Sequence, residues 1–301
     1  MEHLRGRRIW VTGAGGFVGR HLAPRLQAAG ARVTPTDTDL DVGDAAAVAS
    51  AMARIRPDAV VHLAARSSVS ASEADAHGVY RVNFGGAQAV LAGAREHAPG
   101  ARILLVGSGQ VYGSAAPGAL PFDESAALRP ASPYAWSKAC ADLLGGAYAA
   151  RGIDVVQVRP FNHTGPGQGD AFVASSFARQ VAEIEAGRRE PVLHVGNLDS
   201  VRDFLDVEDV VDAYLRLLDP AVPSAVYNVA SGRGVPIRRL LEMVLALSSA
   251  SPRLECTPDR FRSRDACVGD ARRLARATGW EPRRPLEATL ARLLQDWRAR
   301  S

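Results

Sequence analysis

Residues 7–19, RRIWVTGAGGFVG, decide the fold. The apolar run at 8–12 predicts a buried strand, and glycines at positions 13, 16 and 19 lead into a helical pattern that starts at Phe17. Glycines at this spacing allow a tight turn, a close approach of backbone N–H groups to a pyrophosphate, and tight packing of helix on strand. The stretch therefore predicts a dinucleotide-binding strand–turn–helix unit.

Outward from this unit, short apolar runs alternate with helical patterns over the first 160 residues or so. The runs at 8–12, 32–36, 59–63, 103–107 and 155–159 predict strands, and the segments 17–29, 45–55 and about 73–97 predict helices. Such alternation is typical of a parallel sheet covered by helices on both faces. The predicted fold class is α/β, a Rossmann-type doubly wound parallel sheet.

After Pro160 the pattern loosens. A Gly/Pro loop at 162–170 precedes helical patterns at 172–187 and from Val207 to Leu218, and further helices are predicted near 237–247 and from Leu286 onward. These segments predict a smaller, interleaved C-terminal lobe, to which the family resemblance given below assigns substrate binding. We assign 1–161 and 204–230 to an NAD(P)-binding Rossmann domain, and 162–203 and 231–301 to the second lobe.

The composition is that of a globular protein, with 47% hydrophobic and 23% charged residues. No apolar run approaches the roughly 18 residues of a membrane span, and the chain enters its first strand without a signal-peptide core. Cys140, Cys256 and Cys267 have spacings that fit neither a metal site nor a disulfide framework. We therefore expect a cytoplasmic protein with no metal and no membrane partner.

The net charge of +4 raises the question of nucleic acid, because basic domains often bind it. The arginines, however, are interleaved with acidic residues along most of the chain, and no nucleic-acid-binding motif is recognisable. No nucleic-acid partner is predicted.

Lys138 is the single lysine among the 36 basic residues. It closes the stretch YAWSK at 134–138, in which Tyr134 and Lys138 stand four residues apart and so share one face of a helix. A phenol of ordinary pKa, near 10, is a poor proton shuttle at neutral pH, and a neighbouring cation lowers that pKa. The spacing predicts a catalytic acid–base pair.

Asp37 ends the second predicted strand, about 20 residues after the glycines. A carboxylate at this place accepts a hydrogen bond from a ribose 2′-hydroxyl and repels a 2′-phosphate. No arginine directly follows it. NAD(H) is therefore the preferred cofactor, with NADP(H) possible.

The stretches GAGGFVG (13–19), HLAA (62–65), GSGQVYG (107–113) and YAWSK (134–138), with Asn83, together resemble the extended short-chain dehydrogenase/reductase family, also called the NAD-dependent epimerase/dehydratase family. The resemblance covers essentially the whole chain. It implies that Ser108 joins Tyr134 and Lys138 as a catalytic residue. It also implies the following cofactor contacts: Gly13, Gly15, Gly16, Phe17, Val18, Gly19, Asp37, Asp41, Val42, Leu63, Ala64, Ala65, Asn83, Tyr134 and Lys138. For Asn83 the alternative is that it caps a turn.

The two residues after Ser108 separate the branches of this family. Nucleotide-sugar 4,6-dehydratases place a carboxylate there, and GDP-fucose synthase-like epimerase/reductases place a cysteine directly after the serine. This chain has Gly109 and Gln110, and an amide has no proton to exchange at neutral pH. The expected chemistry is hydride transfer without elimination or epimerisation.

Sequence stretches around the second lobe indicate the expected substrate more specifically. RPFNHTGPGQ (159–168), FVASSFARQVAEIEAG (172–187) and VGNLDSVRDFLDVEDVV (195–211) resemble the GDP-mannose dehydratase/reductase branch, above all the GDP-6-deoxy-4-keto-D-mannose reductases. The resemblance implies a homodimer that reduces GDP-4-keto-6-deoxy-D-mannose at C4 to GDP-D-rhamnose. The implied substrate-binding residues are Ser108, Gln110, Asn162, Arg179, Arg202 and Arg262.

Several alternatives stay open at this point. Each arginine could instead form an ordinary surface ion pair, and His163 lies either near the nicotinamide or in a purely structural loop. A 4-epimerase or 4,6-dehydratase that retains NAD would use the same fold. A non-catalytic Rossmann-type sensor is the alternative from a different class, and the retained tyrosine and lysine argue against it.

Overall fold

A six-stranded sheet organises the first part of the chain in the computed structural model, which describes residues 1–67, 69–115, 120–256 and 265–300. All neighbouring strands pair in parallel, which confirms the predicted fold class. The strand order is β2-β1-β3-β4-β5-β9. These strands are β1 (Arg8–Thr12), β2 (Arg32–Thr36), β3 (Ala59–His62), β4 (Arg102–Val106), β5 (Val155–Pro160) and β9 (Val226–Val229).

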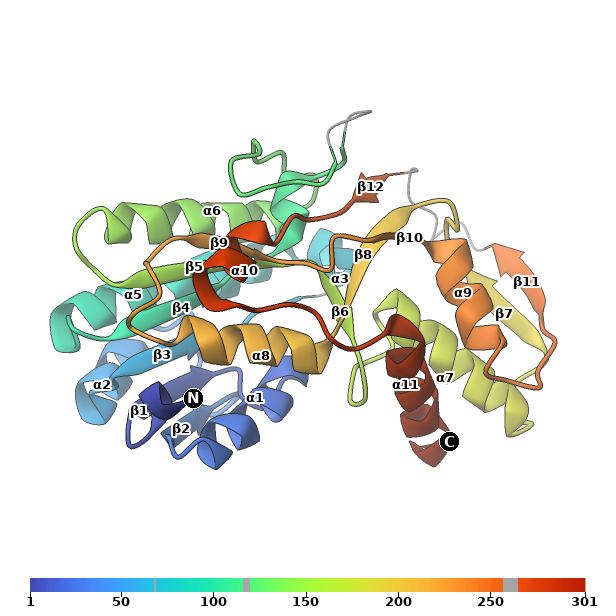
Figure 1. The fold of residues 1–301 in the computed structure, drawn as a ribbon, viewed down its shortest axis with the longest axis horizontal. Helices are drawn as coiled ribbons and strands as arrows, with labels where there is room; N and C mark the ends of the chain where they lie inside the picture. Colours follow the sequence, from blue (N-terminus) through green and yellow to red (C-terminus); the bar gives the residue numbers. More distant parts are fainter. Residues whose placement is uncertain (68, 116–119, 257–264, 301) are drawn as a thin grey trace.

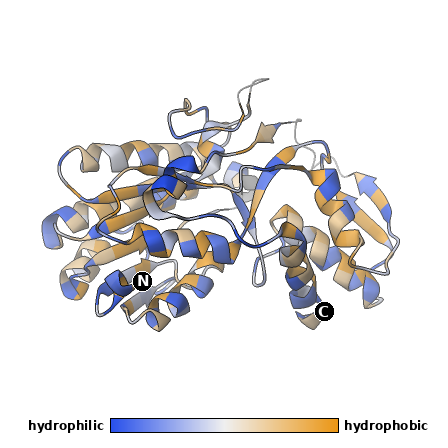
Figure 2. Cartoon of the chain, in the orientation of Figure 1, coloured by the Kyte–Doolittle hydropathy of each residue, from blue (hydrophilic) through white to orange (hydrophobic). Residues whose placement is uncertain are grey.

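Helices cover both faces of this sheet (Figure 1). The strand residues alternate between two hydrophobic cores: Ile9 and Val11 pack into one, and Trp10 between them packs into the other. Figure 2 shows the resulting concentration of hydrophobic residues in the central strands. The first core is closed by α1 (Phe17–Ala28), α8 (Val207–Leu217) and α10 (Arg272–Thr278), and the second by α2 (Ala45–Ile55), α5 (Gly86–His97) and α6 (Pro133–Ala149).

The helix predicted over about 73–97 is confirmed as a continuous helical run from Ala76 to His97, and the chain departs from helical geometry at Asp75, near the predicted start. The run consists of α4 (Ala76–Tyr80), a π-helical turn at Arg81–Gly85, and α5, and the separate short helix α3 (Val69–Ala74) precedes Asp75. Asp75 caps α4 by accepting a hydrogen bond from the backbone N–H of Gly78 at 2.9 Å. The π-helical turn carries Asn83, whose side chain reaches back to the loop after β3.

The rest of the chain adds smaller sheets and a third hydrophobic core. The strands are β6 (Asn162–Thr164), β8 (Val201–Asp206), β10 (Gly234–Pro236) and β12 (Ala266–Cys267) in one sheet system, and β7 (Val192–Val195) with β11 (Arg253–Cys256) in another. The core lies between α7 (Val173–Glu185), α9 (Ile237–Leu245) and α11 (Leu286–Arg300), at the right of Figure 1. Short 3-10 turns occur at Glu2–Leu4 and Gly109–Tyr112.

Two features of this part differ from a simple sequential lobe. The start of the predicted Gly/Pro loop forms β6, because Asn162–Thr164 pairs in parallel with Phe204–Asp206 of β8. Leu274 of α10 and Trp280 after it pack into the first core, with α10 lying beside β9 and α8, although they come late in the chain. The domain boundaries stay a prediction. Within the described residues, no helix is both long and apolar enough to cross a membrane.

Candidate active site

The glycine turn lies where the chain changes direction across the sheet. Strand β2 is on one side of β1 and β3 is on the other, so the carboxyl end of β1 is a switch point, the usual place of a dinucleotide site. Gly13 has φ of 70°, and a Cβ there would lie 2.6 Å from the backbone nitrogen of Ala64. The turn at 13–19 and the predicted Leu63–Ala65 segment are therefore adjacent.

Asp37 faces the same turn. A Cβ on Gly15 would overlap the Asp37 carboxylate, so that carboxylate lies directly over the glycine loop. A cavity of about 400 Å³ opens beside it, lined in part by Gly15, Gly19, Arg20 and Asp37. A glycine turn with a carboxylate beside it fits the pyrophosphate and ribose of a nicotinamide dinucleotide.

Asn83 links two elements of the site. Its side-chain oxygen accepts a hydrogen bond from the backbone N–H of Arg66 at 2.8 Å, and its amide nitrogen donates to the hydroxyl of Ser137 at 2.9 Å. Ser137 lies between Tyr134 and Lys138 and donates to the Tyr134 carbonyl at 2.7 Å. Asn83 is 2% exposed, so it fastens the loop after β3 to α6 rather than merely capping a turn.

Tyr134 and Lys138 are carried by the first turns of α6. Ser132 caps this helix by accepting a hydrogen bond from the Ala135 backbone N–H at 3.2 Å, and Pro133 occupies its first position. Both functional side chains are buried, and the Lys138 ammonium donates to the carbonyl oxygen of Val106, at the end of β4, at 2.8 Å. The structure thus places the pair beside the strand that leads to Ser108.

Ser108 follows β4 and starts the 3-10 turn Gly109–Tyr112. Its hydroxyl accepts a hydrogen bond from the backbone N–H of Gln110 at 3.1 Å, and it lies close enough to the Tyr134 phenol to lower the pKa of that phenol. Ser108, Tyr134 and Lys138, predicted as the catalytic set, are brought together at the carboxyl edge of the sheet. Their catalytic roles stay a prediction.

Burial controls the electrostatics of this set. It raises the pKa of Tyr134, and the hydrogen bond with Ser108 opposes that rise. It lowers the pKa of Lys138 to about 8, and burial together with the Lys138 charge lowers the pKa of His62 to about 3. The expected lowering of the Tyr134 pKa by Lys138 is not found, because the ammonium is directed at the Val106 carbonyl. The phenol is therefore held in its proton-donating form.

Comparisons with known proteins agree with this geometry. The family model described as "NAD dependent epimerase/dehydratase family" matches residues 9–230. This chain belongs to that family. Its cofactor is accordingly a nicotinamide dinucleotide, NAD(P), and it belongs to a family of enzymes.

Two curated relatives and one solved structure are similar over nearly the full length. A GDP-6-deoxy-D-mannose reductase from Pseudomonas aeruginosa is 37% identical over 98% of both chains. A UDP-glucose 4-epimerase from Mycolicibacterium smegmatis is 30% identical over 98% of this chain and 99% of its own. The structure of RMD from Pseudomonas aeruginosa complexed with NADPH superposes with a TM-score of 0.89 at 36% identity, covering 98% of this chain and 100% of that one.

The predicted substrate residues of this epimerase/dehydratase family member lie in the turn after β4 and on the second part of the chain. Asn162 is half-buried on β6, and Gln110 is half-buried in the turn after Ser108. Arg202 is held by both carboxylate oxygens of Asp265, at 2.7 and 2.6 Å. Arg179 contacts Glu183 at 2.6 Å and Asp170 at 3.1 Å, so both arginines form ion pairs within the chain. Arg262 lies outside the described residues.

Two further predicted residues sit near the outer rim of the cofactor side. Asp41 is exposed, pairs with Arg81 at 2.6 Å, and has its pKa lowered mainly by that hydrogen bond. Val42 is buried against α5, where a Cβ on Gly86 would lie 2.9 Å from it.

His163 bridges the two parts of the chain. Its Nδ1 donates to the carbonyl oxygen of Phe161 at 2.9 Å, and its ring stacks on Phe17 with centroids 6.0 Å apart. Burial lowers its pKa. Because Phe17 is the first residue of α1, this contact sets the β6 loop against the cofactor turn.

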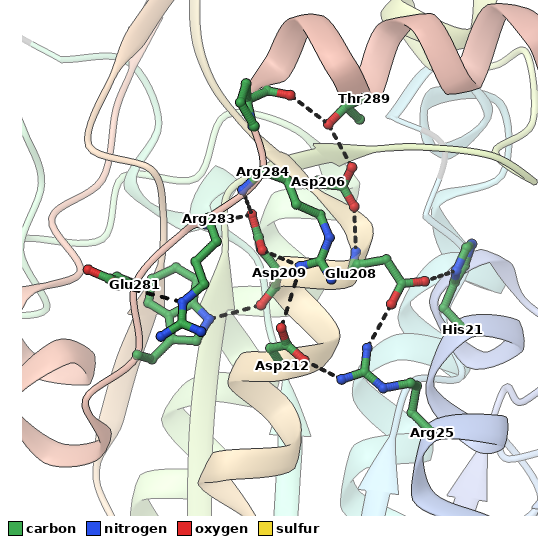
Figure 3. A network of polar contacts seen from close by, with 12 residues as sticks. His21, Arg25, Asp206, Glu208, Asp209, Asp212, Glu281, Arg283, Arg284 and Thr289 are labelled. Carbon is green, nitrogen blue, oxygen red and sulfur yellow. Dashed lines mark hydrogen bonds and ion pairs between the residues drawn. The ribbon is translucent and has the colours of Figure 1, made fainter. Parts of the chain in front are cut away.

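A polar network fastens α8 to α1 and to the C-terminal segment (Figure 3). His21 contacts Glu208 at 2.8 Å through Nδ1 and the Pro166 carbonyl oxygen at 2.9 Å through Nε2. Arg25 bridges Glu208 and Asp212 of α8 at 2.9 and 2.5 Å. The Gly/Pro loop after Asn162 is thereby held against the helix that follows the glycine turn.

A buried polar cluster that was not predicted from the sequence lies directly behind Ser108, Tyr134 and Lys138. Arg159 of β5 pairs with Asp142 of α6, and Tyr112 joins them. The three residues come from a strand, a helix and a turn that meet only in the folded chain. Their spacing in the sequence therefore follows no helical or strand periodicity. The available signal was the residue type: Arg159 stands between Val158 and Pro160 in a largely apolar strand, and a buried guanidinium needs a buried partner.

Proposed function

We propose that this enzyme reduces the C4 keto group of a nucleotide-linked 4-keto-6-deoxy sugar, converting GDP-4-keto-6-deoxy-D-mannose to GDP-D-rhamnose. The observation that carries the proposal is the composition of the site. Ser108, Tyr134 and Lys138 converge, while the two positions after Ser108 offer a glycine and an amide. The similarity to a GDP-6-deoxy-D-mannose reductase supports the choice of substrate.

Tyr134, Ser108 and Lys138 have different roles in the proposed reduction. The nicotinamide supplies the hydride when bound. The Tyr134 phenol, kept protonated by burial, donates its proton to the oxygen that was the C4 carbonyl. Ser108 hydrogen-bonds the same oxygen and aligns it with the phenol. Lys138 carries a positive charge at neutral pH and holds the cofactor ribose.

Elimination and epimerisation each need more than this set provides. Removing water from the sugar requires an acid and a base beside the carbons that lose hydroxyl and hydrogen, and Gln110 offers no exchangeable proton. Cys267, the buried thiol nearest the turn, contacts the Gly109 carbonyl oxygen at 3.7 Å and has its pKa raised to about 12 by burial. Such a thiol is a poor base at neutral pH.

NADH is the proposed preferred coenzyme, with NADPH as the alternative. The Asp37 carboxylate over the glycine turn accepts a hydrogen bond from a ribose 2′-hydroxyl and repels a 2′-phosphate. Arg20 lines the same cavity and is the residue that would favour NADPH, the coenzyme in the Pseudomonas aeruginosa structure. This choice is tested by measuring kcat/KM with NADH and with NADPH, in the parent protein and in Asp37→Asn. The variant is expected to gain activity with NADPH.

The remaining assignments belong to the same proposal. Asn162 and Gln110 bind the sugar, and Arg179, Arg202 and Arg262 bind the diphosphate or guanine, since guanidinium groups suit phosphate oxygens. The division into a cofactor domain and a nucleotide-sugar lobe keeps the boundaries stated above. We also propose a cytoplasmic homodimer: Cys140, Cys256 and Cys267 are free thiols, and α6 exposes Trp136 and Leu143.

A substrate panel tests the reaction. Nucleotide 4-keto-6-deoxy sugars with GDP, dTDP and UDP are offered with NADH or NADPH, the loss of reduced coenzyme is followed by absorbance, and the product is identified by NMR. We expect turnover of the GDP sugar, and its loss in Tyr134→Phe. An enzyme purified with tightly held NAD that converts a sugar without added coenzyme would instead be an epimerase or dehydratase, as the similarity to a UDP-glucose 4-epimerase allows.

A further inference from the structure

A buried ion pair lies one helical turn beyond Lys138. Asp142 of α6 accepts two hydrogen bonds from Arg159 of β5, from Nε at 3.1 Å and from Nη2 at 2.6 Å. The two residues are 4% and 6% exposed. A bidentate pair at this depth has a fixed geometry, because both partners have lost their water and depend on each other.

The same guanidinium reaches the turn that follows Ser108. Arg159 Nη1 donates to the Tyr112 hydroxyl at 2.8 Å, and that hydroxyl donates to the side-chain oxygen of Asn228 on β9 at 2.7 Å. Tyr112 is completely buried and is the last residue of the 3-10 turn Gly109–Tyr112. Arg159 therefore joins α6, β9 and the Ser108 turn through one chain of hydrogen bonds.

Gly107 shows how close the pair lies to the reacting groups. A Cβ on Gly107 would be 3.8 Å from Asp142 Oδ1 and 3.9 Å from Arg159 Cγ. The residue before Gly107, Val106, accepts the Lys138 hydrogen bond, and the residue after it is Ser108. The ion pair thus lies against the backbone that separates the Lys138 contact from the Ser108 hydroxyl.

We propose that Arg159, clamped by Asp142 and Tyr112, is a positioning residue that sets the Ser108 hydroxyl relative to the Tyr134 phenol. The ion pair fixes the position of α6, which carries Tyr134. The Tyr112 contact fixes the last residue of the turn that follows Ser108. The helix and the turn therefore cannot move relative to each other. Apolar side chains alone would fill this space, but they would not fix the position of the turn relative to α6.

Two variants remove the clamp with little change in shape. Tyr112→Phe deletes only the hydroxyl and keeps the ring that stacks on Phe122 and Phe161. Asp142→Leu/Arg159→Met replaces the ion pair by apolar groups of similar size, a change that is often neutral or stabilising in buried pairs. Tyr227→Phe is the matched control, because it also removes one hydroxyl from a buried ring, but that hydroxyl bonds the Pro223 carbonyl oxygen at 2.9 Å.

The test compares stability, cofactor binding and turnover. We expect the Tm of both variants to stay within a few degrees, the NADPH or NADH Kd to stay within about twofold, and kcat to fall about tenfold or more, roughly 1.4 kcal/mol of barrier. The KM should change little, and the control should keep kcat. A kcat within twofold of the parent in folded, cofactor-binding variants would overturn the positioning role.

This inference rests on the proposed reduction only for the kinetic readout. If the parent enzyme reduces no keto sugar, the proposed function fails by itself. Crystal structures of the parent and of Tyr112→Phe with bound coenzyme then decide the positioning role. We expect the separation of the Ser108 and Tyr134 hydroxyl oxygens to be larger in the variant than in the parent, and an unchanged separation would refute the positioning role.

Discussion

The ammonium of Lys138 donates to the carbonyl oxygen of Val106 at 2.8 Å, and burial holds its pKa at about 8. A carbonyl is a weak partner for a buried ammonium, so the folded protein binds this proton less tightly than the unfolded chain, whose lysine has a pKa of 10.5. Lys138, a residue proposed to act in the reaction, is therefore a source of instability at neutral pH.

Lys138→Met should stabilise the protein near neutral pH by ~2 kcal/mol, while abolishing turnover. Below the folded-state pKa of about 8, both folded and unfolded lysines are protonated, so the folded state bears the full cost of the buried charge. Between 8 and 10.5 the folded lysine releases its proton first, and the cost shrinks as pH rises. Urea unfolding of parent and variant at pH 7 and pH 10 measures the difference; a variant less stable than the parent at pH 7 would contradict it.

Gly269→Ala should destabilise the protein by ~2 kcal/mol, because its Cβ would lie 2.6 Å from both Phe161 Cζ and Ala230 Cβ. Phe161 precedes the proposed substrate residue Asn162, so kcat/KM should fall as well. Phe161→Leu removes the ring atoms in the way, and the double variant should recover part of the loss. Gly100→Ala is the control, since its Cβ would meet nothing within 4 Å. Additive losses in the double variant would show that Phe161 is not the obstacle.

The five strands before residue 160 were predictable almost to the residue, because runs such as Arg8–Thr12 and Arg32–Thr36 are short, largely apolar or β-branched, and followed by glycine or aspartate. The π-helical turn around Asn83 was not predictable, because helical periodicity does not reveal that Asn83 must reach the backbone of Arg66. The glycine turn and the Tyr134–Lys138 pair depend on local spacing and could be found from sequence. The pairing of Arg159 with Asp142 depends on how β5 meets α6, which no local pattern records.

Leu143→Lys should weaken the proposed dimer about a hundredfold or more, converting it to monomer at micromolar concentration. Trp136, Cys140, Leu143 and Ala147 recur at helical spacing on α6, and Leu143 is 67% and Trp136 52% exposed, an unusual surface for a monomer. Analytical ultracentrifugation measures the mass. Leu247→Lys, at the end of α9, is the control and should leave the mass unchanged. A parent protein that sediments as a monomer would rule out this surface as a stable dimer contact.

Asp209→Asn should cost several times more stability than Asp212→Asn, although the two residues are neighbours in the network of Figure 3. Asp209 is 1% exposed, and its Oδ2 accepts from the backbone N–H groups of Arg283 and Arg284 at 3.1 and 3.0 Å, while its Oδ1 accepts from the Arg284 guanidinium at 2.5 Å. Every group facing this carboxylate is a donor, so either orientation of an amide sets an NH₂ group against donors.

The expected cost of Asp209→Asn is ~3 kcal/mol, because it leaves buried donors and a guanidinium without an acceptor. The Asp212 side chain is 26% exposed and contacts Arg25 at 2.5 Å and Arg284 at 3.4 Å. Because water solvates these partly exposed charges, the ion pairs contribute little stability, and Asp212→Asn should lower the free energy of unfolding by about 1 kcal/mol or less. Urea denaturation of both variants, at low and at high salt, makes the comparison. Salt should reduce the effect at Asp212 far more than at Asp209, since screening acts on exposed charges and hardly reaches buried ones. Equal losses at the two positions would mean that the junction between α8 and the segment before α11 is held by packing, not by Asp209.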